Sequence, residues 1–182
     1  TIRSALGRAL ETARCKLVYD RTLTRRAIQL LASECDAHVA PLELFFGETS
    51  TVRPVVYFFR DDAQKRALMG AARVDMAKPW REEIYLSLEG YPHPVLGHEL
   101  AHVMAGKYAS GPFHVAGALG GVLPNPGLIE GIAVAAAPND ADTLTPEQWS
   151  RALRELELLP PIKQLFGFGF FGEAAAKAYT VT

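Results

Sequence analysis

The stretch VLGHELAHVMAG, residues 95–106, places two histidines and one glutamate on a short apolar segment. His98 and His102 are four residues apart, so on a helix their side chains lie on one face, one turn apart. Glu99 is rotated about a third of a turn from His98. This H-E-x-x-H order predicts a metal site with a base beside it.

The spacing suits zinc because both imidazoles can direct a nitrogen at one ion, at the ~2.0–2.1 Å that zinc requires. Glu99 can reach a water next to that ion and take its proton as the water attacks a carbonyl carbon. The alternative is a buried helix whose histidines are satisfied by ordinary hydrogen bonds. We favour Zn²⁺ because polar side chains on so apolar a helix are costly to bury without strong partners; its apolar residues are Val95, Leu96, Leu100, Ala101, Val103 and Met104.

A catalytic zinc needs a third protein ligand, which this stretch lacks. The metzincin pattern requires a glycine and a histidine where this chain has Ala105 and Tyr108, so that class is excluded. His114, in the following loop, could reach back to the metal. His93 precedes the helix and is poorly aimed.

Glu130 is the favoured third ligand. It is an acidic residue in the apolar, small-residue segment GLIEGIAVAAA, within a helix predicted over 126–137 after the cap Asn125. The small residues would let this helix approach the histidine helix closely. A lone buried glutamate needs a cationic partner, and zinc supplies one.

The remaining elements predict an α+β fold, because strands and helices alternate first and helices follow. We expect the strand over 82–88 to have one exposed face and to pair, as an edge strand, with an extended peptide. The helix over 94–105 starts with Pro94 in its first turn and ends at Gly106. The other predicted elements are helices over 3–14, 23–40 (stopped by Pro41), 61–69 and 144–159 (with a Thr145–Gln148 capping box), and strands over 15–20 and 52–59.

The length of 182 residues predicts a single domain spanning 1–182. A net charge of −1 argues against nucleic acid as a partner. The chain starts without Met and stops at AYTVT in mid-pattern, so we expect a piece excised from a longer protein, with any membrane tether outside it. The FGFGFF segment, 166–171, could form a hydrophobic substrate wall or a loop that touches a membrane, but we expect it to cap the core.

Cys15 and Cys35 allow two interpretations. Both could be small buried hydrophobic side chains. They could instead form a disulfide between the first strand and the first long helix, which would indicate an oxidising compartment.

The pair GHELAHVMAG and LIEGIAVA resembles the gluzincin metallopeptidases, the thermolysin-like clan, and more narrowly the bacterial peptidase MA-like domains. The resemblance implies a zincin-like α+β fold, with a small mixed-sheet lobe, a helical lobe and the histidine helix between them. It implies zinc on His98, His102 and Glu130, with Glu99 as base.

The resemblance also implies a peptide or protein substrate and an extracytoplasmic or membrane-associated location. Tyr108, His114 and Tyr179 are the candidates for stabilising the oxyanion or contacting substrate. Two alternatives stay open: a catalytically inactive domain that binds or scaffolds, and a metal enzyme acting on something other than peptides.

Overall fold

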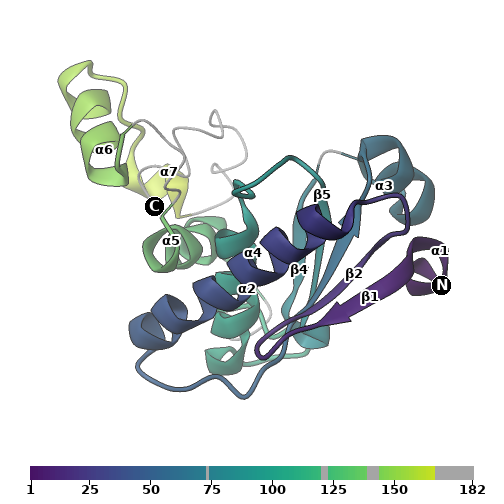
Figure 1. The fold of residues 1–182 in the computed structure, drawn as a ribbon. Coiled ribbons are helices and arrows are strands. Elements are labelled where there is room, and N and C mark those ends of the chain that lie inside the picture. Colours follow the sequence, from purple (N-terminus) through teal and green to yellow (C-terminus); the bar gives the residue numbers. More distant parts are fainter. Residues whose placement is uncertain (73, 120–122, 139–143, 167–182) are drawn as a thin grey trace.

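The computed structural model describes residues 1–72, 74–119, 123–138 and 144–166 of the chain. It confirms the α+β class, since a mixed five-stranded sheet is combined with helices (Figure 1). In chain order the elements are α1 (Ile2–Leu6), β1 (Gly7–Glu11), β2 (Lys16–Asp20), α2 (Arg25–Phe46), β3 (Val55–Phe59), α3 (Asp62–Met69), β4 (Met76–Lys78), η1 (Pro79–Arg81), β5 (Glu83–Ser87), α4 (Leu96–Ala105), η2 (Gly106–Tyr108), β6 (Ala118–Leu119), β7 (Leu123–Pro124), α5 (Pro126–Ala136), α6 (Pro146–Glu155) and α7 (Ile162–Leu165).

The large sheet has the strand order β1-β2-β3-β5-β4. Strands β2, β3 and β5 run parallel, and the outer strands β1 and β4 are antiparallel to their neighbours. The central strands are rich in β-branched and aromatic residues, which suit a sheet covered on both faces. The three-residue strand β4 forms one edge.

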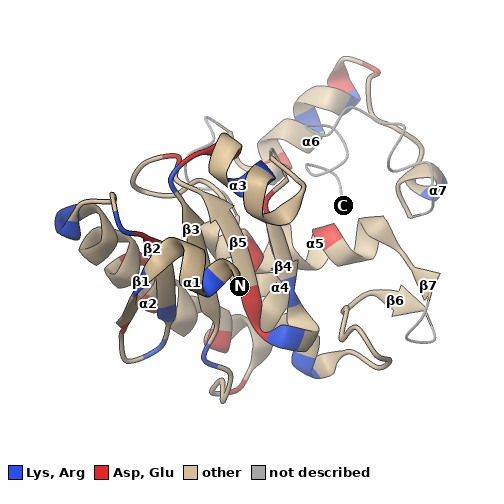
Figure 2. Cartoon of the chain, turned by 90° about the vertical axis from the view of Figure 1, so that its right-hand side faces the viewer, with Lys and Arg blue, Asp and Glu red and all other residues tan. Residues whose placement is uncertain are grey.

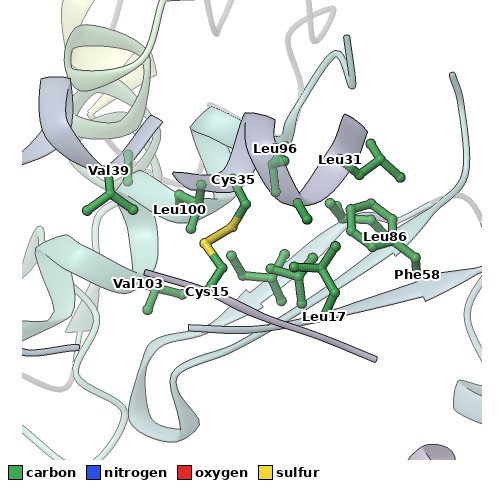
Figure 3. Packing of buried hydrophobic residues seen from close by; sticks show 14 of the residues in the cluster. Cys15, Leu17, Leu31, Cys35, Val39, Phe58, Leu86, Leu96, Leu100 and Val103 are labelled. Atoms are coloured by element: carbon green, nitrogen blue, oxygen red, sulfur yellow. A yellow bond between two sulfur atoms is a disulfide. The ribbon is translucent and has the colours of Figure 1, made fainter. Parts of the chain in front are cut away.

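Helices α2 and α4 cover one face of the sheet and make the main hydrophobic core (Figure 3). Leu17, Phe58 and Leu86 from the sheet pack there with Leu31 of α2 and Leu100 of α4, and all five are buried. Alternate strand residues point to opposite faces, so the remaining large side chains of these strands form a second core.

That second core lies on the opposite face, where α1 and α3 contribute. It contains Val18, Tyr57, Phe59 and Tyr85 from the sheet with Leu6 of α1. The two layers explain why the central strands carry apolar residues on both faces.

Helix α4 lies between the sheet and α5, as Figure 1 shows. It contacts β4 and β5 on one side and α5 on the other. Its buried apolar residues hold it on the sheet, so the side chains that it presents toward β4 and α5 are fixed in place.

A disulfide joins Cys15, just before β2, to Cys35 in α2 (Figure 3). Both residues are fully buried in the main core. The structure therefore agrees with the second interpretation of the cysteines, a disulfide between the strand and the helix.

The predicted helix over 3–14 is wrong beyond its first turns. Helix α1 ends at Leu6 because Gly7 adopts a left-handed conformation, with φ of 83°, which caps the helix. The residues that follow form β1 and pair with β2. Pairing with a neighbouring strand outweighs the local helical pattern here.

The helix predicted over 23–40 does not stop at Pro41. Helix α2 continues to Phe46 and is capped by Gly47 in a left-handed conformation. Proline removes one helical hydrogen bond, but Leu42, directly after it, is 1% exposed and packs in the main core. This packing holds the last turns in place.

The strand predicted over 82–88 is present as β5, but it has no exposed face and is not at an edge. All five of its residues are buried, between β3 and β4. Glu83 takes part because its carboxylate accepts hydrogen bonds from Tyr57 and Tyr85. The edge strand beside β5 is β4, which the sequence did not indicate.

The helices predicted over 61–69, 126–137 and 144–159 are present as α3, α5 and α6, with the predicted caps Asn125 and Thr145–Gln148. Most of the segment 166–171 lies outside the described residues. Among the described residues, no helix is both long and apolar enough to cross a membrane.

Candidate metal centre

His98 and His102 lie one turn apart on α4, and their imidazoles face Glu130 on α5. The two Nε2 atoms are 3.1 Å apart. Glu130 Oε2 is 3.1 Å from Nε2 of His98 and 3.5 Å from Nε2 of His102. All three side chains are mostly buried. The structure thus brings together the three residues that we predicted as ligands, and they are the group among the described residues that could hold a metal ion.

Helix α5 can approach α4 because its facing residues are small. Gly131 and Ala133 are buried, and Ala133, which has no exposed surface, packs in the main core together with residues of α4. Asn125 caps the helix by accepting the N–H of Leu128, so α5 begins at a fixed point. Figure 2 shows an acidic position on this otherwise uncharged helix, and Glu130 is the acidic residue of α5.

The Glu130 carboxylate is stabilised in its ionised form. Burial alone would raise its pKa, but hydrogen bonds and charge from His102 and His98 outweigh burial and lower the pKa to about 2. Glu130 is therefore an anion at any pH near neutrality, as a metal ligand must be.

Glu99 has the opposite electrostatic environment. It is 7% exposed, and burial raises its pKa to about 7. The charge of His98 and a hydrogen bond from the Ala77 backbone N–H oppose this rise, whereas the charges of Asp75 and Glu130 add to it. A carboxylate with a pKa near neutrality is a stronger proton acceptor than an ordinary glutamate.

A cavity of about 240 Å³ adjoins this group. His98, Glu99, His102 and Glu130 form one part of its lining. The facing part comes from the edge strand β4 and the turn η1, through Asp75, Met76, Ala77, Pro79 and Trp80. A ligand in this cavity would therefore contact the edge of the sheet and the three potential metal ligands together.

Two other predicted residues lie elsewhere. The Tyr108 hydroxyl donates to the Phe46 carbonyl at 3.1 Å and also contacts Glu48, and its ring stacks on Phe46. His114 is exposed in the loop after η2 and lines a separate cavity with Lys107. Neither lines the metal-site cavity within the described part of the chain.

Tyr179, the third candidate for the oxyanion, lies outside the described residues. His93 is buried, and its Nε2 is 2.9 Å from the Ser87 carbonyl. Its backbone N–H donates to Glu34. His93 therefore holds the turn before α4 through these hydrogen bonds. Since neither His93 nor His114 belongs to the group, its third member is Glu130.

The sequence did not indicate the contributions of Ala77, Asp75 and Lys65. Ala77 acts through its backbone N–H, which no side-chain pattern can reveal. Lys65 is fully buried and its Nζ lies 2.6 Å from Asp75 Oδ1. From the sequence, a lysine in a short helix is expected at the surface. Lys65 is buried because α3 packs against the sheet.

Comparison of the chain with protein-family models, with curated proteins and with solved structures gives no match.

Proposed function

We propose that this domain is a zinc-dependent peptidase, in which His98, His102 and Glu130 hold Zn²⁺ and Glu99 is the general base. The observation that carries the proposal is the convergence of three donor atoms from α4 and α5, with a buried carboxylate on the same cavity. The resemblance of the two motifs to the gluzincins supports it.

The donor set fits zinc. In a tetrahedral site with bonds of ~2.0–2.1 Å, ligand atoms are roughly 3.3 Å apart, and the three separations here are 3.1, 3.1 and 3.5 Å. Neutral imidazole nitrogens and a carboxylate oxygen all offer electron pairs, so they repel unless a cation or a proton lies between them. Two histidines and one glutamate also leave a fourth position for substrate.

When bound, zinc would supply Lewis-acid chemistry, polarising the scissile carbonyl and lowering the pKa of a water. Glu99 would accept a proton from the attacking water and later donate it to the leaving amine. The Ala77 N–H would hold the carboxylate of Glu99 toward the cavity. Burial of Glu99 keeps bulk water from competing for that proton.

We propose that an extended substrate pairs with β4, and not with β5 as the sequence predicted, because β4 lies at the edge of the sheet. One side of β4 pairs with β5, and no other described strand pairs with its second side. Met76 and Ala77 also line the metal-site cavity. An extended peptide could add to this free edge and bring one of its peptide bonds to the metal.

The alternative is a non-catalytic domain that binds or scaffolds, which would share the fold and the metal. A buried Glu99 with a raised pKa favours catalysis, because a structural metal site needs no base. We further propose an extracytoplasmic location, supported by the Cys15–Cys35 disulfide. Any membrane tether would lie outside the described residues.

Metal binding provides the first test. We expect about one zinc per chain, measured by elemental analysis and by competition with a chelating dye. Glu130→Ala should weaken zinc binding by more than about 100-fold, since even residues that only support a ligand contribute about 10–100-fold. His114→Ala is the matched control and should bind as wild type. Loss of binding in His114→Ala but not in Glu130→Ala would show that the third ligand is wrong.

Catalysis provides the second test. Glu99→Gln should retain zinc and lose hydrolysis of unfolded casein or a mixed peptide library, by roughly 10²–10⁴-fold. Glutamine keeps the shape and the acceptor for Ala77 but cannot take a proton. If the zinc-loaded full-length protein cleaves nothing, or if Glu99→Gln cleaves as fast as wild type, the peptidase proposal fails and the binding-domain alternative replaces it.

A further inference from the structure

Asp75 presents a carboxylate to the metal-site cavity while its counter-ion lies behind it. The Asp75 side chain is 19% exposed and lines the cavity. Lys65 Nζ is 2.6 Å from its Oδ1, and Lys65 is fully buried and is not part of the lining. The Ser87 N–H contacts the same oxygen at 3.4 Å. Among the described residues both partners of Asp75 therefore use Oδ1, and Oδ2 keeps its acceptor capacity.

The described lining of the cavity holds no lysine or arginine that could pair with Asp75. It contains three acidic side chains, Asp75, Glu99 and Glu130. The two charges of a zinc ion would balance Glu99 and Glu130. The Asp75 carboxylate would then be the negative charge that a ligand in the cavity can contact, because Lys65 approaches this carboxylate from the protein interior.

We propose that Asp75 is a specificity-determining residue that binds a cationic group, an ammonium or a guanidinium, of the substrate. This inference rests on the proposed function, because it takes the metal-site cavity as the place where peptides bind. Charge-assisted hydrogen bonds to a carboxylate are among the stronger polar contacts, so Asp75 can select substrates.

The position of Asp75 in the chain supports this role. It directly precedes β4, whose residues Met76 and Ala77 line the same cavity. A peptide that extends along this edge would place a side chain or its terminal amine beside Asp75. The ion pair to Lys65, which is anchored in α3, holds the carboxylate in that place.

Peptide binding tests the proposal without requiring turnover. The protein is zinc-loaded Glu99→Gln, and the probes are labelled peptides that differ only in lysine or norleucine at one position. Each is made with a free and an acetylated N-terminus. We expect the cationic peptides to bind at least about tenfold more tightly, measured by fluorescence anisotropy. A preference for lysine over norleucine that survives acetylation assigns the lysine side chain, whereas an affinity that acetylation lowers equally for both peptides assigns the terminal ammonium.

Two further variants isolate the carboxylate. Asp75→Asn alone would leave Lys65 buried without a partner and risk unfolding. Two proteins are therefore compared in the zinc-loaded Glu99→Gln background, one with Lys65→Met and one with Lys65→Met/Asp75→Asn. They differ only at Asp75. We expect the preference for cationic peptides to persist in the first and to disappear in the second. Glu82→Gln removes an exposed carboxylate outside this cavity and should leave the preference unchanged.

An equal preference in the two Lys65→Met proteins would overturn the assignment. So would binding to zinc-loaded Glu99→Gln that is undetectable, or that depends neither on lysine nor on a free N-terminus. The outcome is separable from that of the proposed function. Cleavage without a preference for cationic peptides would reject the role of Asp75 and keep the peptidase. A preference for cationic peptides in binding, without any cleavage by the protein with Glu99 intact, would reject the peptidase and keep the role of Asp75.

Discussion

Glu83 shows how this fold keeps a carboxylate inside a sheet. It is 8% exposed on β5, and it accepts hydrogen bonds from Tyr57 at 3.2 Å, Tyr85 at 2.5 Å and Arg81 at 2.5 Å. Burial alone would raise its pKa, but Arg81 and the two tyrosine hydroxyls outweigh burial, so the pKa of Glu83 is lowered. The folded state therefore favours the ionised form.

Glu83→Gln should lower the free energy of unfolding at pH 7, by about 1–3 kcal/mol, because hydrogen bonds to a charged group are weakened. A lowered folded pKa gives stability that is present above the ordinary pKa of about 4.5 and is lost as pH falls through the folded pKa. The difference between wild type and variant should thus shrink below pH 4.5. Urea unfolding at several pH values measures it. A difference that is constant with pH would contradict this explanation, and Glu82→Gln is the exposed control.

Single residues of the site were predictable where chemistry imposes a spacing. His98, Glu99 and His102 followed from the geometry of one helix, and Glu130 from its place in an apolar segment. Tyr108 was not predictable in the same way, because its direction depends on the turn η2 and on its partner Glu48 from 60 residues earlier. Contacts between distant segments leave no local pattern.

The packing of α5 on α4 sets the distance between Glu130 and the histidines. Ala133 is three residues after Glu130 on the same face and is fully buried. Ala133→Leu should overpack this contact, at a cost of about 1–3 kcal/mol, and move Glu130 away, so that zinc affinity falls. Ala135→Leu is the matched control, since Ala135 is exposed. Chelator competition measures affinity and thermal unfolding measures stability. Equal zinc affinity in the two variants would show that the helix spacing does not govern the site.

Whole elements were predicted well where the local pattern and the packing agree, as in α3, α5 and α6. They were missed where packing overrides the pattern, as at β1 after Gly7 and in α2 beyond Pro41. Strand β4 has three residues and could not be recognised, because so short a segment shows no alternation. Its place at the sheet edge comes from pairing with β5.

At the scale of the molecule, the disulfide ties the sheet to the helix layer that supports the site. Cys15 precedes β2 and Cys35 lies in α2, which also contacts α4 and α5. The sulfur atoms are within the main core, where Figure 3 shows them between Leu17 and Leu100. The sequence left the pairing open because the two cysteines are 20 residues apart, and only the fold brings α2 over β2.

Removing this cross-link should destabilise the whole domain rather than the metal site alone. For a loop of this size we expect Cys15→Ala/Cys35→Ala to lose about 3 kcal/mol of unfolding free energy, because the unfolded chain regains conformational freedom. Urea unfolding of metal-free protein is the measurement, since thiol reductants also bind zinc. Reductant should shift the wild type toward the variant and leave the variant unchanged. Because both sulfurs are buried, thiols must be counted in denaturant without reductant. Two labelled thiols per chain in protein from an oxidising compartment would refute the disulfide and remove the support for an extracytoplasmic location.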